Sequence, residues 1–307
     1  MATRVVGIEI GGTKLQVVVG SPSGDVTERL RFDVDPARGA SGIRDRLSAP
    51  LASLAGTGRI AGGAVGFGGP VDYRTGRVCV SHHVEGWSGF PLGEWIASLL
   101  KAPVRVENDA NTAALAEARL GAGRGHDPVF YATLGSGVGG GLVVDGGIYH
   151  GAPPGEAELG HVRLDREGRT VESCCAGWAV DREVLAHVAR DPSGLLARLV
   201  RESPGREARH LGPALAQGDP AARAILEATA ADLAFGLSHV VHLFHPGRIV
   251  LGGGLALLGE PLRAAVSASL GSWVMEAFHP VPSVALAALR EDAVPTGALL
   301  LAGTTTE

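Results

Sequence analysis

Short apolar runs separated by glycine-rich turns fill the first 35 positions of the chain. Residues 5–10 and 15–19 are almost entirely apolar, and residues 26–34 form a third run after a Pro-Ser-Gly turn. Runs of this length, bounded by glycine and proline, are typical of strands. The N-terminal stretch is therefore predicted to be a meander of three strands.

Helical spacing appears next and alternates with further strands. Residues 43–54 carry an apolar residue every three or four positions, which predicts a helix. The same reasoning predicts helices over 91–100, 109–120, 258–270 and 295–302, a helical region over 177–242 broken near Pro192, Pro204 and Gly218-Asp219-Pro220, and strands over 61–67, 104–106, 129–134, 142–144, 148–149, 248–251 and 284–289. Strand, glycine loop and strand open each half, so we predict an α/β architecture with two related lobes.

Composition narrows the functional classes. Of 307 residues, 45% are hydrophobic and 19% charged, and the formal net charge is −5. Without a basic excess, a nucleic-acid partner is not expected. No run of about 18 apolar residues and no signal peptide are recognisable, so we expect a soluble, cytoplasmic protein that makes no contact with membranes. Three cysteines give no disulfide framework.

Two glycine-rich loops follow apolar strands. The first is Gly11-Gly12-Thr13-Lys14 and the second runs from Gly135 to Gly141. Glycines let backbone N–H groups approach a phosphate, although Gly-Gly is also common in ordinary hairpin turns. The first loop lacks the Gly-Lys-Ser/Thr order of a P-loop. The second matches the dinucleotide fingerprint formally, but a strand follows it where a helix is required. Both are therefore predicted to be hairpin turns that can hold phosphate.

Asp109 begins an alanine-rich helix and has two plausible roles. It can be the N-cap of the helix. It can also act as a general base, because the helix dipole favours its ionised form and an ionised carboxylate can accept the proton of a sugar hydroxyl. The two roles of Asp109 can coexist. Asn108 beside it can orient another hydroxyl.

A third polar cluster contains Glu156, Glu158 and His161. Carboxylates and imidazole suit a polyhydroxy ligand, but a solvated loop is an equally simple interpretation, which we favour for Glu156. Zinc is not favoured, because the adjacent pair Cys174-Cys175 lacks the usual spacing of zinc ligands. Gly252-Gly253-Gly254 after a strand can support a flat nucleobase or can be a plain strand-to-helix turn.

Together these residues resemble the ROK family of sugar kinases (repressors, open reading frames and kinases) nearly from end to end. The resemblance rests on five segments: Glu9-Ile10-Gly11-Gly12-Thr13-Lys14, Glu107-Asn108-Asp109-Ala110-Asn111, Leu134-Gly135-Ser136-Gly137-Val138-Gly139, Glu158-Leu159-Gly160-His161 and Leu251-Gly252-Gly253-Gly254. It implies an actin-like ATPase (ribonuclease H-like) fold with two lobes and a central ligand cleft. The expected lobes are residues 1–118 completed by the C-terminal helix 291–307, and residues 119–290.

The resemblance also implies roles for single residues. Asp109 falls on the catalytic base. The expected sugar-binding residues are Gly68, Gly69, His83, Asn108, Asp109, Glu158 and His161. The expected ATP-binding residues are Gly11, Gly12, Thr13, Lys14, Gly135, Ser136, Gly137, Gly139, Gly253 and Gly254. ATP and Mg²⁺ are the implied cofactors, and a homodimer is the implied assembly.

The sequence departs from the family pattern in three features. Glu9 stands where the family usually has Asp, and it can still hold Mg²⁺ through water. Three cysteines of the family's zinc motif are replaced by Val171, Ser173 and Trp178, so no structural zinc is predicted. His83 replaces an asparagine, which leaves the sugar open.

These observations favour two functions and argue against two others. The first is an ATP-dependent kinase that phosphorylates a hexose hydroxyl, most simply the 6-OH of glucose. The second is an amino-sugar kinase acting on a glucosamine-, mannosamine- or kanosamine-like substrate. A DNA-binding repressor is not expected, because about three residues stand before the first strand where family repressors carry a DNA-binding domain. A non-catalytic sugar sensor is disfavoured by Thr13, Lys14 and Asp109.

Overall fold

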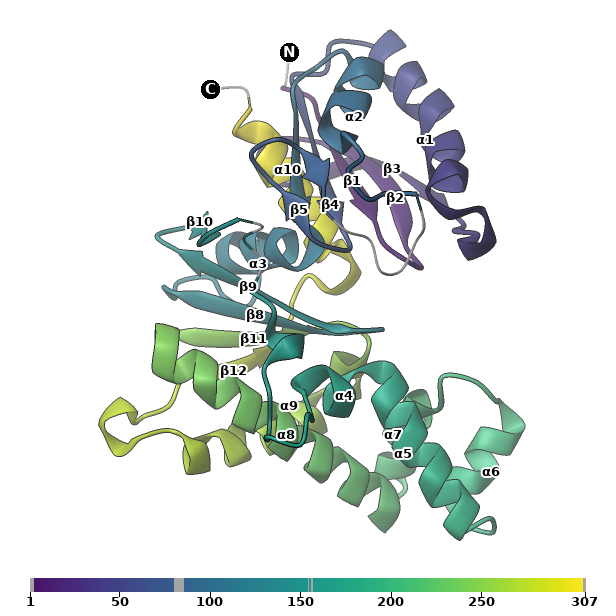
Figure 1. Cartoon of the computed structure of the whole chain (residues 1–307), viewed down its shortest axis with the longest axis vertical. Coiled ribbons are helices and arrows are strands. Elements are labelled where there is room, and N and C mark those ends of the chain that lie inside the picture. The colour runs from purple at the N-terminus through teal and green to yellow at the C-terminus, as the bar shows by residue number, and fades with distance from the viewer. Residues whose placement is uncertain (1–2, 80–85, 154, 156, 306–307) are drawn as a thin grey trace. The chain divides into compact units, whose positions relative to one another are not determined.

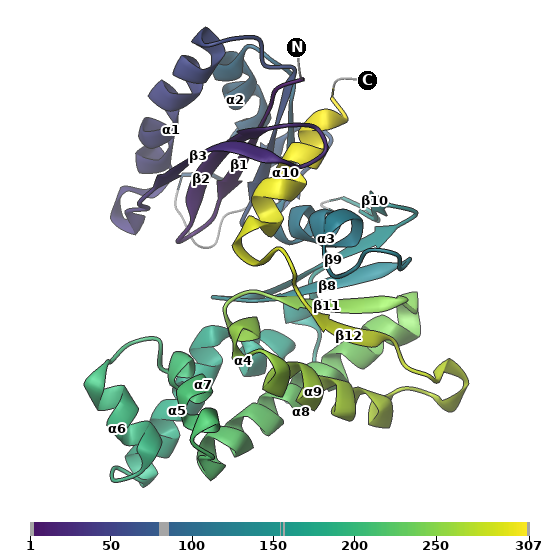
Figure 2. The same ribbon diagram turned by 180° about the vertical axis from the view of Figure 1, so that it is seen from behind.

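Two five-stranded sheets organise the chain, seen from opposite sides in Figures 1 and 2. The computed structural model describes residues 3–79, 86–153, 155 and 157–305. These fall into two compact units. Unit 1 comprises Met1–Arg124, Gly141–Ala157 and Leu289–Glu307, and unit 2 comprises Gly125–Gly140 and Glu158–Ala288.

The first sheet lies in unit 1 and begins with the predicted meander, which is confirmed. Its strand order is β3-β2-β1-β4-β7, with β1, β2 and β3 antiparallel and β1, β4 and β7 parallel. The strands are β1 (Val5–Ile10), β2 (Leu15–Gly20), β3 (Val26–Phe32), β4 (Gly62–Phe67) and β7 (Val104–Asn108). The parallel strands end at the same edge, which later matters for the site.

Helices cover both faces of this sheet. They are α1 (Gly39–Gly56), α2 (Leu92–Leu100), α3 (Asp109–Leu120) and α10 (Ala293–Gly303). Because side chains alternate along a strand, β1 contributes to two cores. Val6, Ile8 and Ile10 pack with α1 and α2, whereas Val5 packs with α10 and with Leu115 of α3. The C-terminal helix is therefore part of the core of unit 1.

The second sheet has the strand order β10-β9-β8-β11-β12, with β8, β11 and β12 parallel. Its strands are β8 (Val129–Leu134), β9 (Val138–Val144), β10 (Gly147–Ile148), β11 (Arg248–Gly252) and β12 (Ser283–Leu286). In both sheets the first strand is central, the next two extend one side and the last two extend the other. The duplicated α/β topology predicted from the sequence is confirmed.

Outside its strands, unit 2 is mostly helical. Its helices are α4 (Val171–Cys175), α5 (Gly177–Arg190), α6 (Leu195–Glu202), α7 (Leu211–Ala216), α8 (Pro220–Phe244) and α9 (Glu260–Leu270). The predicted breaks in the helical region are confirmed. Among the helices that the structure describes, α8 alone is long and apolar enough to cross a membrane, and 56% of its most apolar stretch is buried. The buried core helices of other proteins share this composition, so α8 is weak evidence for a membrane span.

Some elements differ from the sequence-based expectation. The strand after the second glycine loop begins at Val138, four residues earlier than predicted, because three successive glycines join β9 despite their low strand propensity. The hairpin of β5 (Val71–Asp72) and β6 (Arg77–Val78) was not predicted, nor was α4. Two-residue strands and a five-residue helix are too short to show a hydrophobic period.

Candidate functional site

In unit 1, three candidate segments meet at the ends of neighbouring parallel strands. Ile10 of β1 is paired with Phe67 of β4, and Phe67 with Asn108 of β7, so each strand ends at the same level. The next residues are Gly11, Gly68 and Asp109. A methyl group on Gly68 would lie 3.3 Å from Oδ2 of Asp109 and 3.3 Å from Cα of Gly11. The edge beyond the carboxyl ends of parallel strands is where ligands bind in open α/β sheets.

The first glycine loop is a tight hairpin turn between β1 and β2. Gly11 N–H donates to the carbonyl of Lys14 at 2.8 Å, and Gly12, Thr13 and Lys14 are exposed at the tip. Gly11 does not have a left-handed φ, and a Cβ there would make only ordinary contacts. The turn therefore does not require glycine at this position, which is consistent with a backbone kept open for close approach by a ligand.

Asn108 is the N-cap of α3, so the interpretation of Asp109 as the cap is wrong. Asn108 has an extended backbone, and its Oδ1 accepts the N–H of Ala110 at 2.8 Å and of Asn111 at 3.2 Å. Its Nδ2 donates to the carbonyl of Gly69 at 3.3 Å. A carboxamide has two N–H donors, so Asn108 can offer the second to a ligand oxygen.

Asp109 occupies the first turn of α3 and is half-buried. The positive end of the helix dipole favours a carboxylate at this place. A partly accessible carboxylate held beside Gly68 can accept a proton from a bound hydroxyl. The position therefore fits the predicted role as a general base.

Glu9 lies on β1 with 7% of its surface exposed. Nε2 of Gln16, its neighbour on β2, donates to a carboxylate oxygen of Glu9, and Arg29 in turn donates to Oε1 of Gln16 at 2.8 Å. Burial raises the pKa of Glu9 above its ordinary value, and the bond from Gln16 opposes this shift. Among the described residues no group of three metal-ligating side chains comes together.

In unit 2, the second glycine loop is a short turn that three hydrogen bonds hold in place, two between backbone groups and one to a side chain. Gly135 N–H donates to the carbonyl of Gly137 at 2.9 Å, and the carbonyl of Gly135 accepts the N–H of Gly177 at 2.8 Å. The carboxylate of Glu172 accepts the N–H of Val138 at 2.9 Å. Strand β9 follows directly, so the prediction of a hairpin rather than a dinucleotide-binding turn is confirmed.

Glu158 and His161 lie beside this loop. Glu158 precedes a short 3-10 helix, Leu159–His161, and His161 is the last residue of this helix. A methyl group on Gly160 would overlap the carbonyl oxygen of Val138. The side chains are 47% and 78% exposed, with Oε2 of Glu158 4.0 Å from Nε2 of His161. Unit 2 thus places two polar side chains suited to hydroxyl groups next to a glycine turn.

The third glycine turn follows β11, the parallel neighbour of β8. Gly253 has φ +83°, and a methyl group there would lie 2.5 Å from the backbone nitrogen of Leu134. The turn therefore packs directly on the residue that precedes Gly135. Gly254 is exposed, and a methyl group there would meet nothing within 4 Å.

The residues that occupy the positions of the family's zinc cysteines make other contacts. Val171 is buried against Gly236 of α8, and Ser173 forms a reciprocal capping box with Thr170 at the start of α4. Nearby, Arg169 pairs with Asp232 of α8 at 2.6 Å and also donates to Sγ of Cys174 at 3.3 Å. Burial raises the pKa of the Cys175 thiol.

Sequence reasoning assigned no role to three residues that contact the candidate segments. The buried Glu107 pairs with the half-buried His150 behind Asn108, and Glu172 holds the second glycine turn. Glu107 was within a quoted motif, whereas nothing in the local sequence marks the other two. His83 and Glu156 lie outside the described residues.

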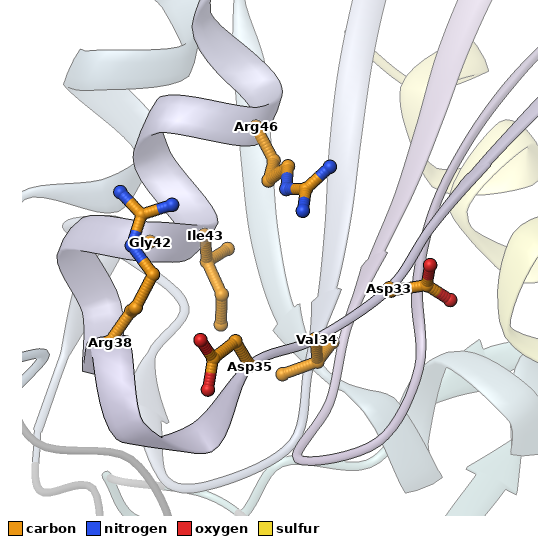
Figure 3. A pocket seen from close by; sticks show the side chains of 7 residues that line it. All are labelled: Asp33, Val34, Asp35, Arg38, Gly42, Ile43 and Arg46. Atoms are coloured by element: carbon orange, nitrogen blue, oxygen red, sulfur yellow. The ribbon is translucent and has the colours of Figure 1, made fainter.

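Two surface cavities of unit 1 are not lined by the predicted site residues. A cavity of about 110 Å³ at the start of α1 combines two aspartates with two arginines (Figure 3); it is lined by Asp33, Val34, Asp35, Arg38, Gly42, Ile43 and Arg46. A larger one, of about 530 Å³, lies beside β7 and α2; its lining includes Tyr73, Arg74, Glu94 and Arg105.

Residues 5–305 match the family model described as ROK family. The chain is 29% identical to a glucokinase of Thermotoga maritima over 303 residues, covering 96% of each protein. It is 31% identical to a kanosamine kinase of Amycolatopsis mediterranei over 308 residues, covering 97% of this chain and 95% of that protein. A crystal structure of a ROK family glucokinase from Streptomyces griseus with glucose and AMPPNP superposes with a TM-score of 0.85 at 30% identity, covering 98% of this chain and 99% of that one. These similarities confirm the predicted actin-like ATPase fold.

Proposed function

Because the chain belongs to the ROK family, we propose that it is an ATP-dependent sugar kinase that transfers the γ-phosphate of ATP to a hexose hydroxyl, with the 6-OH of glucose as the first candidate. The similarity to glucokinases over nearly the whole chain supports this proposal. The chemistry of the two sets of candidate residues supports it independently.

The observation that carries the proposal is the meeting of Gly11, Gly68 and Asp109 at three strand ends of unit 1. Gly68 has no side chain between the carboxylate and the first glycine turn, so a hydroxyl and a phosphate can both approach Asp109. The carboxylate accepts the proton as the hydroxyl oxygen attacks phosphorus. Asn108 positions the sugar through its remaining N–H. Phosphoryl transfer needs this kind of positioning more than covalent chemistry.

The remaining roles follow from exposed groups of each unit. Thr13 and Lys14 supply a hydroxyl and a cation for phosphate oxygens, and the turn at Gly135–Gly137 supplies backbone donors. Glu158 and His161 bind sugar hydroxyls as acceptor and donor. Gly253 and Gly254 leave an open backbone surface for adenosine.

Glu9 is the residue that would hold Mg²⁺, through water. Mg²⁺ keeps several water ligands and binds one or two carboxylates together with substrate phosphates. A single buried carboxylate that already accepts a bond from Gln16 fits such an outer role better than direct coordination. When bound with ATP, Mg²⁺ would neutralise phosphate charge.

An amino-sugar kinase is the second candidate. The chain is 31% identical to a kanosamine kinase over nearly its full length, so a shifted sugar preference is compatible with the family. A panel of glucose, mannose, glucosamine, mannosamine and kanosamine with ATP and Mg²⁺, followed by ADP release, decides between the two. Absence of turnover with every sugar would contradict the kinase proposal.

Replacement of Asp109 tests the mechanism. Asp109→Asn should lower kcat by about 10²- to 10⁴-fold, because the base is lost, while the affinity for the sugar changes little. ADP release gives the rate and calorimetry gives the affinity. Asp45→Asn is the control, since Asp45 is an exposed partner of Arg38 on α1 of the same unit. Unchanged turnover in Asp109→Asn would remove the catalytic assignment.

The homodimer and the two-lobed domain division stay predictions from the family resemblance, and the cytoplasmic location stays a prediction from the sequence. Light scattering of the purified protein tests the homodimer.

A further inference from the structure

The geometry points to a positioning unit behind the proposed base: we propose that Glu107 and His150, stacked on Tyr73, hold Asn108 and Asp109 in their working orientation. This inference rests on the proposed function for its kinetic meaning. Its structural part stands on contacts within unit 1 alone.

Glu107 is the centre of the unit. It is the last-but-one residue of β7 and is 4% exposed. Its Oε1 accepts the backbone N–H of Asn108 at 2.9 Å and the Nδ2 of Asn111 at 3.0 Å. One carboxylate oxygen therefore ties together the cap of α3 and its first turn.

His150 engages the other oxygen of the same carboxylate. Its Nε2 lies 2.6 Å from Oε2 of Glu107, although the two residues are 43 positions apart. Since a carboxylate only accepts, Nε2 carries the hydrogen of this bond. His150 follows β10, which packs beside α3 in unit 1.

Tyr73 packs against one face of the His150 imidazole. The two rings are stacked, with centroids 3.7 Å apart and planes 14° apart. Gly155 completes the packing: it has φ +82°, and a methyl group there would lie 2.9 Å from the carbonyl oxygen of His150. The imidazole is thus stacked on the ring of Tyr73, and Gly155 packs on the backbone and Cβ of His150.

The arrangement leaves one polar atom unsatisfied. Asn111 donates through Nδ2 to Glu107 and, at 3.4 Å, to the carbonyl of Gly155. Its buried Oδ1 has no hydrogen-bond partner in the described part of the chain. Because Glu107 Oε1 and the carbonyl of Gly155 are both acceptors, they require the Nδ2 side of the amide to face them, and Oδ1 is left without a partner, which is rare for a buried polar atom. A buried, branched network that ends on the backbone of Asn108 is what positioning of the next residue requires.

The test compares His150→Leu with the wild type, with glucose as the probe unless the sugar panel gives a better substrate. Loss of the bond to Glu107 lets the first turn of α3 shift, so kcat/KM for the sugar should fall about 100-fold while KM for ATP changes less than about two-fold. His150→Gln, which restores an N–H donor, should recover most of this loss.

Two further variants separate positioning from stability. Glu117→Gln changes another buried glutamate of α3, whose carboxylate accepts the N–H groups of Ala122 and Leu289 at 2.7 Å, and it should lower the Tm without changing kcat/KM. Tyr73→Phe keeps the ring stacked on His150 and should behave as wild type. A His150→Leu variant with wild-type kinetics, or with the same small effect as Glu117→Gln, would overturn the inference.

Hydrogen exchange provides a readout that needs no activity. The amides of Ala110 and Asn111 donate to the cap and should exchange faster in His150→Leu, whereas amides near the end of α3 should not change. If the wild type phosphorylates no sugar, the proposed function fails, and this exchange result still decides whether the unit orders the cap. Unchanged exchange at Ala110 and Asn111 would overturn it.

Discussion

At the scale of single residues, the first question is which groups the structure places in an unusual environment. Glu9 is one: burial raises its pKa above the ordinary value of 4.5. The folded state then holds this proton to higher pH than the unfolded state does. The contribution to stability is therefore complete below about pH 4.5 and is lost as the pH rises through the raised pKa.

Glu9→Gln should remove this loss, because an uncharged amide can still accept the bond from Gln16. The variant is expected to gain Tm relative to the wild type between about pH 4 and about pH 7, measured by thermal unfolding. Glu28→Gln, on the exposed surface of β3, is the control and should show no such trend. A difference in Tm that is the same at both pH values would contradict the argument.

The residue scale also shows what sequence reasoning could not decide. Asn and Asp are both good N-caps, and the sequence interpretation considered only Asp109 as the cap, one residue too late. The backbone decided it: β7 extends through Asn108, which puts Asp109 inside the first turn. The pair of Glu107 and His150 was beyond prediction, because it depends on bringing together residues 43 positions apart.

At the scale of elements, the two glycines after β11 offer a matched comparison. Gly253→Ala would put a side chain on a left-handed backbone and against the backbone of Leu134. It should therefore lower the free energy of unfolding by about 3 kcal/mol or more. Gly254→Ala has open space and should fold with a Tm near that of the wild type. Thermal unfolding checks both, and equal Tm values would contradict the packing argument.

Gly254→Ala also reports on nucleotide binding. A methyl group on this exposed backbone should raise KM for ATP and leave KM for the sugar unchanged, if adenosine lies there as proposed. An unchanged KM for ATP would show that adenosine does not bind at Gly254.

Elements whose apolar residues recur with a clear helical or strand period were predictable, and elements without such a period were not. Helices such as α1 and α9 show apolar residues at helical spacing, so their existence followed from the sequence. The glycine-rich start of β9 has no such pattern, and pairing in the sheet decides its conformation. The glycine turns themselves were found because glycine marks turns directly.

At the scale of the whole molecule, topology explains why distant motifs gather. Each sheet has a central first strand followed by parallel neighbours, so the ends of β1, β4 and β7, or of β8 and β11, meet without any sequence signal. Duplication of strand, loop and strand could be recognised from the sequence. The pairing that brings Gly68 between Gly11 and Asp109 could not, since strand order depends on packing of the complete core.

A second question at this scale is whether the fold depends on a metal. A structural zinc contributes its binding free energy to folding, so a chelator destabilises such proteins. Here each altered position has another function: Val171 packs on α8, Ser173 caps α4, and the ring of Trp178 lies 5.5 Å from the guanidinium of Arg182. The segment is anchored to α8 by apolar contact and by the pair of Arg169 with Asp232.

We therefore expect no zinc in the purified protein by elemental analysis, and the same Tm with and without EDTA. The exposed pair contributes at most about 1 kcal/mol, so Arg169→Ala should lower the Tm only slightly, whereas Val171→Ala should lower it more by opening a cavity worth about 1 to 3 kcal/mol. One zinc per chain, or a fall in Tm with EDTA, would show that other residues have taken over the metal site.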